Sequence, residues 1–198
     1  MHAWLPSLDG MVPALERGVR VAEIGCGVGF STLLMAKAFP KSEIIGYDFH
    51  ASSVKQANAH SAAHGMAGRV RFETMAAKDI QDRDFDLVTM FDCLHDMGDP
   101  RGCAVHIRTM LKPDGRWMLV EPIAGDTPAS AIGNPVSRLY YNASTMICVP
   151  TALVQEVGEA LGAQAGEAKL TEVLTGAGFS HVRRATESPF NMVLEARP

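Results

Sequence analysis

Short apolar or β-branched runs alternate with helical stretches along most of this 198-residue chain. Predicted strands span 19–24, 43–47, 69–73, 85–91 and 116–121, and predicted helices span 31–39, 51–64, 102–111 and 170–175. The alternation predicts an α/β fold in which a mostly parallel sheet carries helices on both faces. Ligands of such sheets bind outside the carboxyl ends of the strands, so we expect functional residues there.

The second half of the chain departs from this rhythm. Lys112–Gly115 (KPDG) predicts a turn before the fifth strand. Residues 122–166 mix Gly, Pro, Ser and Asn with paired tyrosines, and predict a loop with one or two helices lying over the site. Residues 181–185 and 190–196 predict two strands with a tight antiparallel connection. We therefore expect a single domain over 1–198, with an insertion at 124–165.

Composition excludes several classes of protein. Eighteen Lys and Arg against 22 Asp and Glu give a net charge of −4, which disfavours nucleic-acid binding by this chain alone. No apolar run approaches the roughly 18–20 residues needed to span a bilayer, and the amino-terminal residues lack a signal-peptide pattern. The cysteines form no CxxC pair, so we predict neither a metal site nor a disulfide framework. A cytoplasmic protein with no membrane partner is expected.

The strongest local motif is a glycine loop between the first strand and the first helix. The segment EIGCGVG (23–29) has G-x-G-x-G spacing rather than the G-x-G-x-x-G of dinucleotide-binding folds. Glycines there permit a sharp turn and close backbone approach to a ligand. The second strand ends about twenty residues later in Asp48, where a carboxylate can accept hydrogen bonds from ribose hydroxyls. The alternative is a tight turn that binds nothing.

Four segments resemble the class I S-adenosylmethionine (SAM)-dependent methyltransferases, over nearly the whole chain. They are AEIGCGVGFSTLLMA, GYDFHASSVKQA, FDLVTMFDCLHDMGDP and LKPDGRWMLVEP. The resemblance implies a doubly wound, Rossmann-like seven-stranded sheet in the order 3-2-1-4-5-7-6, with the last strand antiparallel. It also implies SAM as the cofactor, S-adenosylhomocysteine (SAH) as the product and a small molecule as the methyl acceptor.

One subgroup of that family is more similar than the rest. HDMGDP, NPVSRLYYNAST, ICVP and LGAQAGEAKL resemble bacterial methyltransferases that carry a winged-helix domain ahead of the catalytic domain. That domain is absent from this sequence, and WLPSLDGM matches the region between the two domains of those relatives. The resemblance implies a catalytic domain alone, as a monomer or a dimer, with 124–165 as its substrate lid.

The resemblance also implies a cofactor site. Its loop residues lie under the methionine moiety, Asp48 holds the ribose and Phe49 faces the adenine. Ala76 stands where most relatives place an acid near the adenine amino group, so backbone atoms near Ala77, or Asp79, are expected to replace it. The full set expected to bind the cofactor is Glu23, Gly25, Cys26, Gly27, Asp48, Phe49, Ala76, Ala77, Phe91 and Asp92.

His95 and Glu121 are the expected catalytic residues. LHDMGDP resembles the LHDWSD segment of small-molecule O-methyltransferases, whose histidine deprotonates the acceptor. Glu121 matches the acid that orients this histidine, and a further acid of the family aligns with Gln164. Imidazole titrates near neutrality, which suits a general base. On the residues alone, His95 and Asp96 could instead simply cap the turn between strand and helix.

The acceptor pocket is expected in the insertion. Its candidate residues combine aromatic, small polar and thioether side chains, namely Tyr140, Tyr141, Ser144 and Met146. The alternative is a helix that packs its own aromatic residues onto the sheet. His60 and His64 lie four apart on one predicted helix, but without a third ligand they predict a solvated helix face rather than a metal site.

Three functions remain open at this point. The first is methyl transfer from SAM to a small molecule, at a hydroxyl oxygen. The second is a SAM- or SAH-binding regulatory module without turnover, which the winged-helix relatives suggest. The third is a nicotinamide-dependent oxidoreductase, which the loop spacing and the terminal hairpin disfavour.

Overall fold

One seven-stranded sheet organises the computed structural model, which describes residues 3–198. The strands lie in the order β3-β2-β1-β4-β5-β7-β6, which confirms the predicted order. Neighbours from β3 to β5 pair in parallel, whereas β7 pairs antiparallel with both β5 and β6. The bounds are β1 Arg20–Ile24, β2 Glu43–Asp48, β3 Arg71–Thr74, β4 Phe85–Phe91, β5 Leu111–Pro122, β6 His181–Glu187 and β7 Asn191–Arg197.

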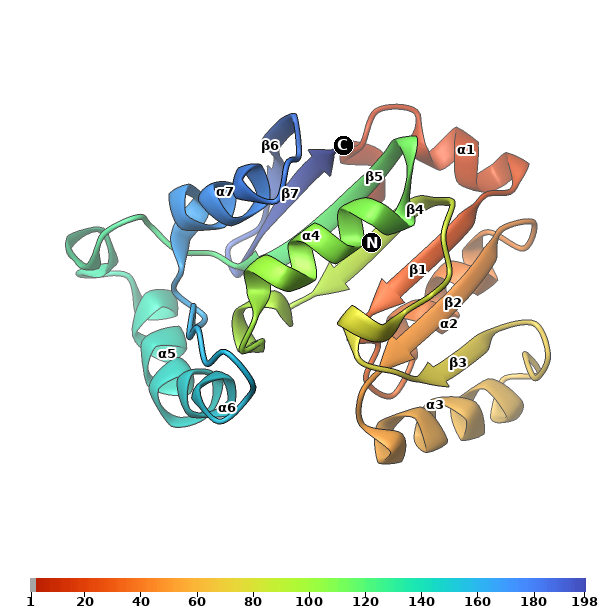
Figure 1. Cartoon of the computed structure of the whole chain (residues 1–198), viewed down its shortest axis with the longest axis horizontal. Helices are drawn as coiled ribbons and strands as arrows, with labels where there is room; N and C mark the ends of the chain where they lie inside the picture. Colours follow the sequence, from red (N-terminus) through yellow and green to blue (C-terminus); the bar gives the residue numbers. More distant parts are fainter. Residues whose placement is uncertain (1–2) are drawn as a thin grey trace.

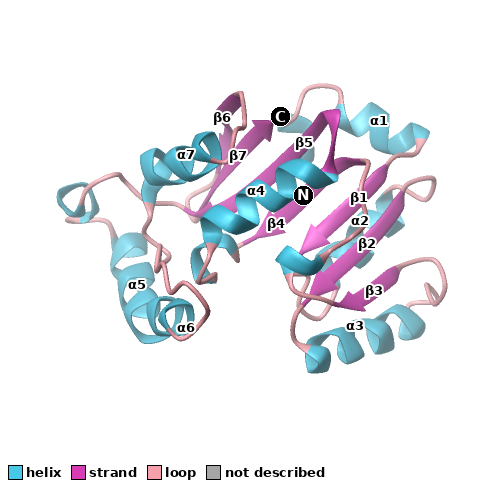
Figure 2. Cartoon of the chain, in the orientation of Figure 1, coloured by secondary structure: helices cyan, strands magenta, loops and turns pink. Residues whose placement is uncertain are grey.

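Helices cover both faces of the sheet (Figures 1 and 2). On one face, α4 (Pro100–Met110) and α7 (Gly166–Gly176) pack in a core with Trp117 and Phe85. On the other, α1 (Met11–Arg17), α2 (Phe30–Ala38) and α3 (Ala51–Ala63) pack against Val21 and Met118. The central strands are buried on both sides, as expected of parallel strands between two helical layers.

Helix α4 shows how the sequence sets these positions. Asp99 caps its amino end by accepting a hydrogen bond from the Gly102 amide (2.8 Å), and Pro100 occupies the first turn, where its missing N–H costs nothing. Its buried stripe recurs at helical spacing, at Cys103, Ala104, Ile107 and Met110. The cap therefore begins this helix directly after the loop that follows β4.

The structure corrects several predicted boundaries. Lys112–Gly115 lies within β5 rather than in a separate turn. In the pairing of the two strands, β5 runs from Leu111 to Arg116 over the stretch in which β4 runs only from Phe85 to Leu87. The extra residues form an irregularity of the kind a β-bulge makes. Helix α1 was not predicted, and α7 begins at Gly166, ahead of the predicted start.

Residues 124–165, called the lid segment below, lie at the end of the sheet toward which the arrowheads of β1 to β4 point (Figure 1). The segment contains α5 (Pro135–Ala143), a π-helical turn (Ser144–Cys148) and α6 (Val149–Leu153). Asn134 caps α5 by accepting a hydrogen bond from the Val136 amide (2.9 Å). The predicted loop with one or two helices is therefore confirmed. Among residues 3–198, no helix is long and apolar enough to cross a membrane.

Candidate functional site

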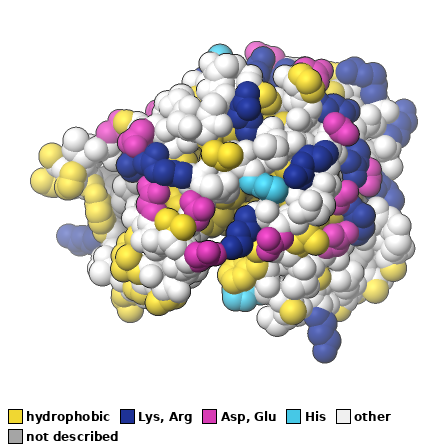
Figure 3. Space-filling model, viewed as in Figure 1, with side chains coloured by type: hydrophobic (Ala, Val, Ile, Leu, Met, Phe, Trp, Pro, Cys, Tyr) yellow, Lys and Arg dark blue, Asp and Glu magenta, His cyan; other side chains and the backbone are white. Residues whose placement is uncertain are grey.

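A cavity of about 610 Å³ lies at the carboxyl ends of the central strands. Figure 3 shows a notch on this side of the molecule, with charged side chains of both signs around it. The cavity lining falls into a strand-end set and a lid set. The strand-end set includes Gly25, Asp48, Phe49, Ala76, Ala77, Cys93 and Asp96, and the lid set is Thr151, Gln155, Glu156 and Val157. The volume is within the range of small-molecule sites.

At the glycine loop, the floor of this cavity is formed by Gly25. Gly25 has a φ of 71°, and its amide donates to the carbonyl of Tyr47 at the end of β2 (2.8 Å). A Cβ at this position would lie 2.5 Å from Cys93 Sγ, so any other residue requires the Cys93 side chain or the loop to shift, at a φ that side chains rarely adopt. The floor is bare backbone, which permits the close approach that a ligand such as an amino-acid moiety requires.

Asp48 connects the loop to the end of β2. Its Oδ2 accepts a hydrogen bond from the Gly27 amide (2.9 Å) and its Oδ1 accepts one from the His50 amide (2.9 Å). The residue is 8% exposed and lines the cavity. A carboxylate can accept about four hydrogen bonds. Both oxygens therefore keep capacity for a pair of ligand hydroxyls, as a ribose presents, in an orientation fixed by backbone donors.

Phe49 contributes an apolar ring to the outer wall of the cavity. It is 59% exposed, and its ring lies beside that of His50, tilted by 36° with the centroids 3.8 Å apart. Ala76 and Ala77 face the same cavity after β3, whereas Asp79 is not among its lining residues. Small backbone-dominated groups occupy the place of the expected acid.

The remaining residues expected to contact the cofactor do not line this cavity. The Glu23 carboxylate is 1% exposed and accepts hydrogen bonds from the hydroxyls of Ser31 and Thr32 (2.8 Å for Thr32), which ties β1 to α2. Burial raises the pKa of this carboxyl to about 7, because its effect outweighs that of the two hydrogen bonds, which lower the pKa. Cys26 and Gly27 belong to the loop without lining the cavity. Phe91 packs against Trp4 (centroids 6.0 Å apart).

Asp92 turns away from the cavity toward the antiparallel edge. Its backbone has a φ of 50°, uncommon for a residue other than glycine, and its Oδ1 accepts a hydrogen bond from Asn191 Nδ2 (2.8 Å). Burial, reinforced by the negative charge of Glu121, raises the Asp92 pKa to about 6. Asp92 therefore belongs to an acidic group around His95 rather than to the cavity wall.

His95 and Glu121 form a buried pair beside the cavity. The imidazole Nδ1 hydrogen-bonds to Glu121 Oε2, and Glu121 Oε1 accepts a hydrogen bond from the Leu94 amide (2.9 Å). The two residues are 4% and 1% exposed. One carboxylate thus fixes both the ring and the turn that carries it, which is the arrangement that orients a catalytic histidine.

The other ring nitrogen of His95 faces a second acid. Nε2 lies 3.2 Å from Asp96 Oδ1, and the ligand atoms of His95, Asp96 and Cys148 all lie within 4.8 Å of one another. Burial lowers the His95 pKa, but the hydrogen bond and charge of Glu121, with the charges of Asp96 and Asp92, outweigh it and raise the pKa above its ordinary value. Nothing in the spacing of the sequence groups Cys148 with the other two.

The lid segment supplies one wall of the cavity. Lys78, which follows β3, forms an ion pair with Glu156 of the lid segment (2.5 Å). The residues predicted for the acceptor pocket lie elsewhere in this segment: Met146 is 78% exposed, and the Ser144 hydroxyl accepts a hydrogen bond from the Ala163 amide (2.9 Å). None of Tyr140, Tyr141, Ser144 and Met146 lines the cavity.

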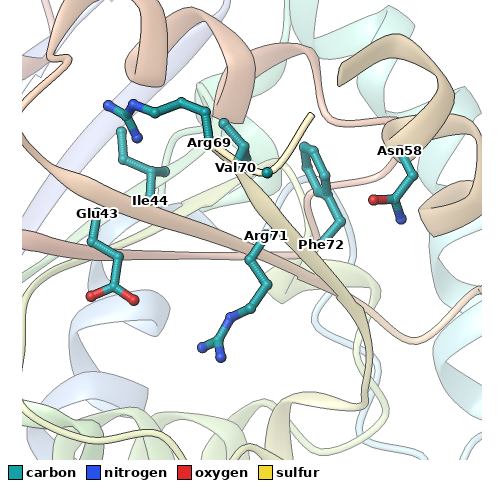
Figure 4. A pocket seen from close by; sticks show the side chains of 8 residues that line it. Glu43, Ile44, Asn58, Arg69, Val70, Arg71 and Phe72 are labelled. Atoms are coloured by element: carbon teal, nitrogen blue, oxygen red, sulfur yellow. The ribbon is translucent and has the colours of Figure 1, made fainter. Parts of the chain in front are cut away.

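A second hollow of about 470 Å³ lies at the other end of β2 and β3 (Figure 4). It begins at Glu43 and Arg71, the first residues of those strands. Glu43 already forms an ion pair with Arg20 (2.8 Å), and Arg71 with Asp82 (2.7 Å). Because ligands of open α/β sheets bind at the opposite, carboxyl end, we assign no function to this hollow.

Comparison with known proteins identifies the family. The family model described as "Methyltransferase domain" matches residues 15–178. A ubiquinone biosynthesis O-methyltransferase of Ralstonia nicotianae is 33% identical over 101 residues, which is 50% of this chain and 41% of that protein. The 27-O-demethylrifamycin SV methyltransferase of Amycolatopsis mediterranei is 32% identical over 124 residues, 62% of this chain and 45% of its own. The chain thus spans less than half of each of these relatives.

Solved structures share the fold. Human N-acetylserotonin methyltransferase in complex with SAM superposes with a TM-score of 0.71 at 18% identity, over 99% of this chain and 50% of that one. The [4+2]-cyclase SpnF superposes with a TM-score of 0.68 at 18% identity, over 93% of this chain and 76% of that one. The fold thus hosts more than one chemistry, and the reaction has to be argued from residues.

The residues on the cavity fit SAM: a bare glycine floor, a carboxylate oriented by backbone amides and an apolar wall. With the family match over most of the chain, this fit makes SAM the cofactor. The protein is a member of the class I SAM-dependent methyltransferases.

Proposed function

We propose that the protein transfers the methyl group of SAM to a hydroxyl oxygen of a small molecule, with His95 as the general base. The observation that carries the proposal is the buried Glu121–His95 pair, held against a cavity that fits SAM. Cys93 and Asp96, which lie in the same turn as His95, line that cavity, so the base lies next to the donor site. O-methyltransferases among the relatives support the same chemistry.

When bound, SAM supplies an electrophilic methyl carbon on a sulfonium, so the protein mainly aligns two reactants. His95 Nε2 accepts the proton of the acceptor hydroxyl. The oxygen freed of its proton would then accept the methyl group that bound SAM supplies. Glu121, already on Nδ1, stabilises the imidazolium that results. Asp96 Oδ1 lies 3.2 Å from Nε2, so the acceptor hydroxyl would approach the ring beside this carboxylate.

This role fixes the direction of the pH dependence. The base works only when it is neutral, and its neighbours raise the His95 pKa above the ordinary 6.5. The rate of transfer to a hydroxyl is therefore expected to rise with pH, with a midpoint above that ordinary value.

We infer that the lid segment also forms the acceptor side. Burial, together with the negative charge of Asp92, raises the pKa of the Tyr140 hydroxyl, so Tyr140 lies near the acidic group around His95. With Tyr141 as its neighbour, it would offer an aromatic wall to an aromatic or apolar acceptor. Residues 1–198 then act as one catalytic domain.

His95→Gln tests the proposal, because it keeps a polar side chain of similar reach and removes the base. Transfer from radiolabelled SAM to a panel of phenols is expected to fall by roughly 10²–10⁴-fold. SAH affinity, measured by calorimetry, is expected to stay within about threefold, because His95 does not line the cavity. His64→Gln, on an exposed histidine at the end of α3, is the matched control. Undiminished transfer by His95→Gln would show that no histidine base is used.

A further inference from the structure

The turn that carries His95 (93–98, the His95 turn) is held from outside by the lid segment. The Gly162 amide donates to the His95 carbonyl (3.2 Å), and the Glu159 amide donates to the Gly98 carbonyl (2.7 Å). These partners are more than sixty residues apart in the chain. The backbone of the turn therefore depends on the lid segment for its hydrogen-bond partners, and an unpartnered backbone group in a buried turn is costly.

One lid side chain, Gln155, contacts this turn at two points. Its Nε2 donates to the Asp96 carbonyl (2.9 Å), and its Oε1 accepts a hydrogen bond from the Gly98 amide (3.0 Å). A Cβ on Gly98 would lie 2.5 Å from the Cβ of Gln155, so the two chains pack as closely as a glycine permits. Both ends of the amide are used, and only an amide supplies a donor and an acceptor in this geometry.

Gln155 also lines the SAM cavity. It therefore contacts the cofactor site and the backbone of the base at the same time. We propose that Gln155 is a positioning residue of the transferase, which fixes the His95 turn only when the lid segment covers the cavity. The inference rests on the proposed role of His95 as the base.

Gln155 holds the backbone of Asp96, and the side chain of the same residue lies against His95. Four groups face the imidazole: Glu121 from β5, Asp92 from the end of β4, Asp96 from its own turn and Cys148 from the lid segment. Glu121 keeps its contact through the Leu94 amide whether or not Gln155 is present. Loss of the two Gln155 hydrogen bonds is therefore expected to loosen mainly the contact between Asp96 and His95 Nε2.

The test compares Gln155→Met with Gln56→Met, the latter an exposed glutamine on α3 whose only hydrogen bond in the described structure is local. Methionine has a similar length and volume but neither hydrogen-bonding group. With SAH present, the His95 ring is titrated by nitrogen NMR. In Gln155→Met its pKa is expected to fall by about one unit, a tenfold loss of proton affinity. The control is expected to titrate as the unchanged protein does.

Kinetics give the second readout. Gln155→Met is expected to lower kcat for transfer to the same phenols about tenfold while the KM for SAM changes less than threefold. Gln155→Glu retains the acceptor for Gly98 and loses the donor to Asp96, so an intermediate loss is expected, and this variant answers the question should Gln155→Met fold poorly. In a His95→Gln background, Gln155→Met is expected to cause no further loss in residual transfer.

An unchanged His95 titration in a folded Gln155→Met protein would overturn the inference. So would an equal loss of kcat in the presence and absence of His95, because Gln155 would then act on something else. Neither result bears on the base itself: that role fails only if His95→Gln transfers at full rate. The two failures are therefore distinguishable.

Discussion

The two sides of the site meet their ligands in different ways. On the nucleoside side, the polar contacts are backbone amides and one carboxylate that they orient, as at Gly25, Gly27 and Asp48. On the acceptor side, ionisable side chains crowd together out of water, with His95 between Glu121 and Asp96. The first arrangement suits one fixed ligand. In the proposed reaction the second handles a proton, and burial makes its charge state sensitive to every neighbour.

This contrast predicts which substitutions each side of the site tolerates. Backbone donors cannot be removed by substitution, so the nucleoside side is vulnerable mainly to added bulk. The acceptor side depends on the exact charges of a few side chains, so it is vulnerable to isosteric changes that leave the shape intact. Four substitutions test this contrast.

Glu121→Gln should have the largest effect. The amide keeps the shape of the side chain but removes its negative charge. That charge offsets the cost of burying the imidazolium, so the His95 pKa should fall without it. Transfer to phenols should fall by roughly 10²–10⁴-fold with SAH affinity nearly unchanged. Glu43→Gln, at the amino end of β2, is the control. A rate equal to that of the control would mean that the acceptor side does not work through charge.

Gly25→Ala should have the next largest effect. The added methyl would lie 2.5 Å from Cys93 Sγ at a φ of 71°, so the Cys93 side chain or the loop must shift within the cofactor cavity. SAH affinity, measured by calorimetry, should fall by roughly 2–3 kcal/mol, or about 30- to 150-fold. Gly10→Ala is the matched control, because Gly10 has a similar φ of 75° and no atom within 4 Å of the added Cβ. Equal SAH binding by the two variants would contradict the close approach of the ligand to the Gly25 backbone.

Glu23→Gln tests the buried acid beneath the loop. Because burial raises the Glu23 pKa from 4.5 to about 7, the stability it contributes is present below about pH 4.5 and is lost as pH rises through about 7. The shift corresponds to about 3 kcal/mol. Denaturant unfolding between pH 5 and 8 should therefore show a smaller loss of stability with pH in Glu23→Gln than in the unchanged protein. The exposed Glu16→Gln should leave the slope as it is; an equal slope in all three proteins would place the titration elsewhere.

Asp48→Asn should have the smallest effect. The amide sets a donor against the amides of Gly27 and His50 and loses one acceptor for the ribose hydroxyls. SAH affinity should weaken by roughly 1–3 kcal/mol. Asp114→Asn, on an exposed stretch of β5, should bind as before. Unchanged SAH affinity in Asp48→Asn would remove the ribose role.

The parts of the molecule predicted from the residues alone are those whose cause is local. The alternation of strands and helices, the glycine loop and the end of β2 at Asp48 follow from patterns a few residues long. The strand order and the pairing of Glu121 with His95 were expected from the resemblance to the family. The extra residues within β5 were less visible, because KPDG signals a turn wherever it occurs and only the pairing with β4 absorbs it into the strand.

The contacts of the lid segment are the least predictable part. The sequence places the acceptor pocket in its aromatic stretch, whereas the lid residues that line the SAM cavity are Thr151, Gln155, Glu156 and Val157. Gln155 and Gly98 are 57 residues apart, and no periodicity within either segment indicates that they meet. Such contacts depend on how an irregular chain folds back over the sheet, which is a property of the whole fold.

The covering of the cavity by the same residues that brace the His95 turn has a consequence for turnover. Thr151 to Gly162 supply both the wall over the donor and the hydrogen bonds to the turn. Displacement of residues 151–162 would therefore remove the wall over the donor and the hydrogen bonds to the turn in one step. Exchange of the nucleoside through this wall would couple product release to the order of the turn that carries His95.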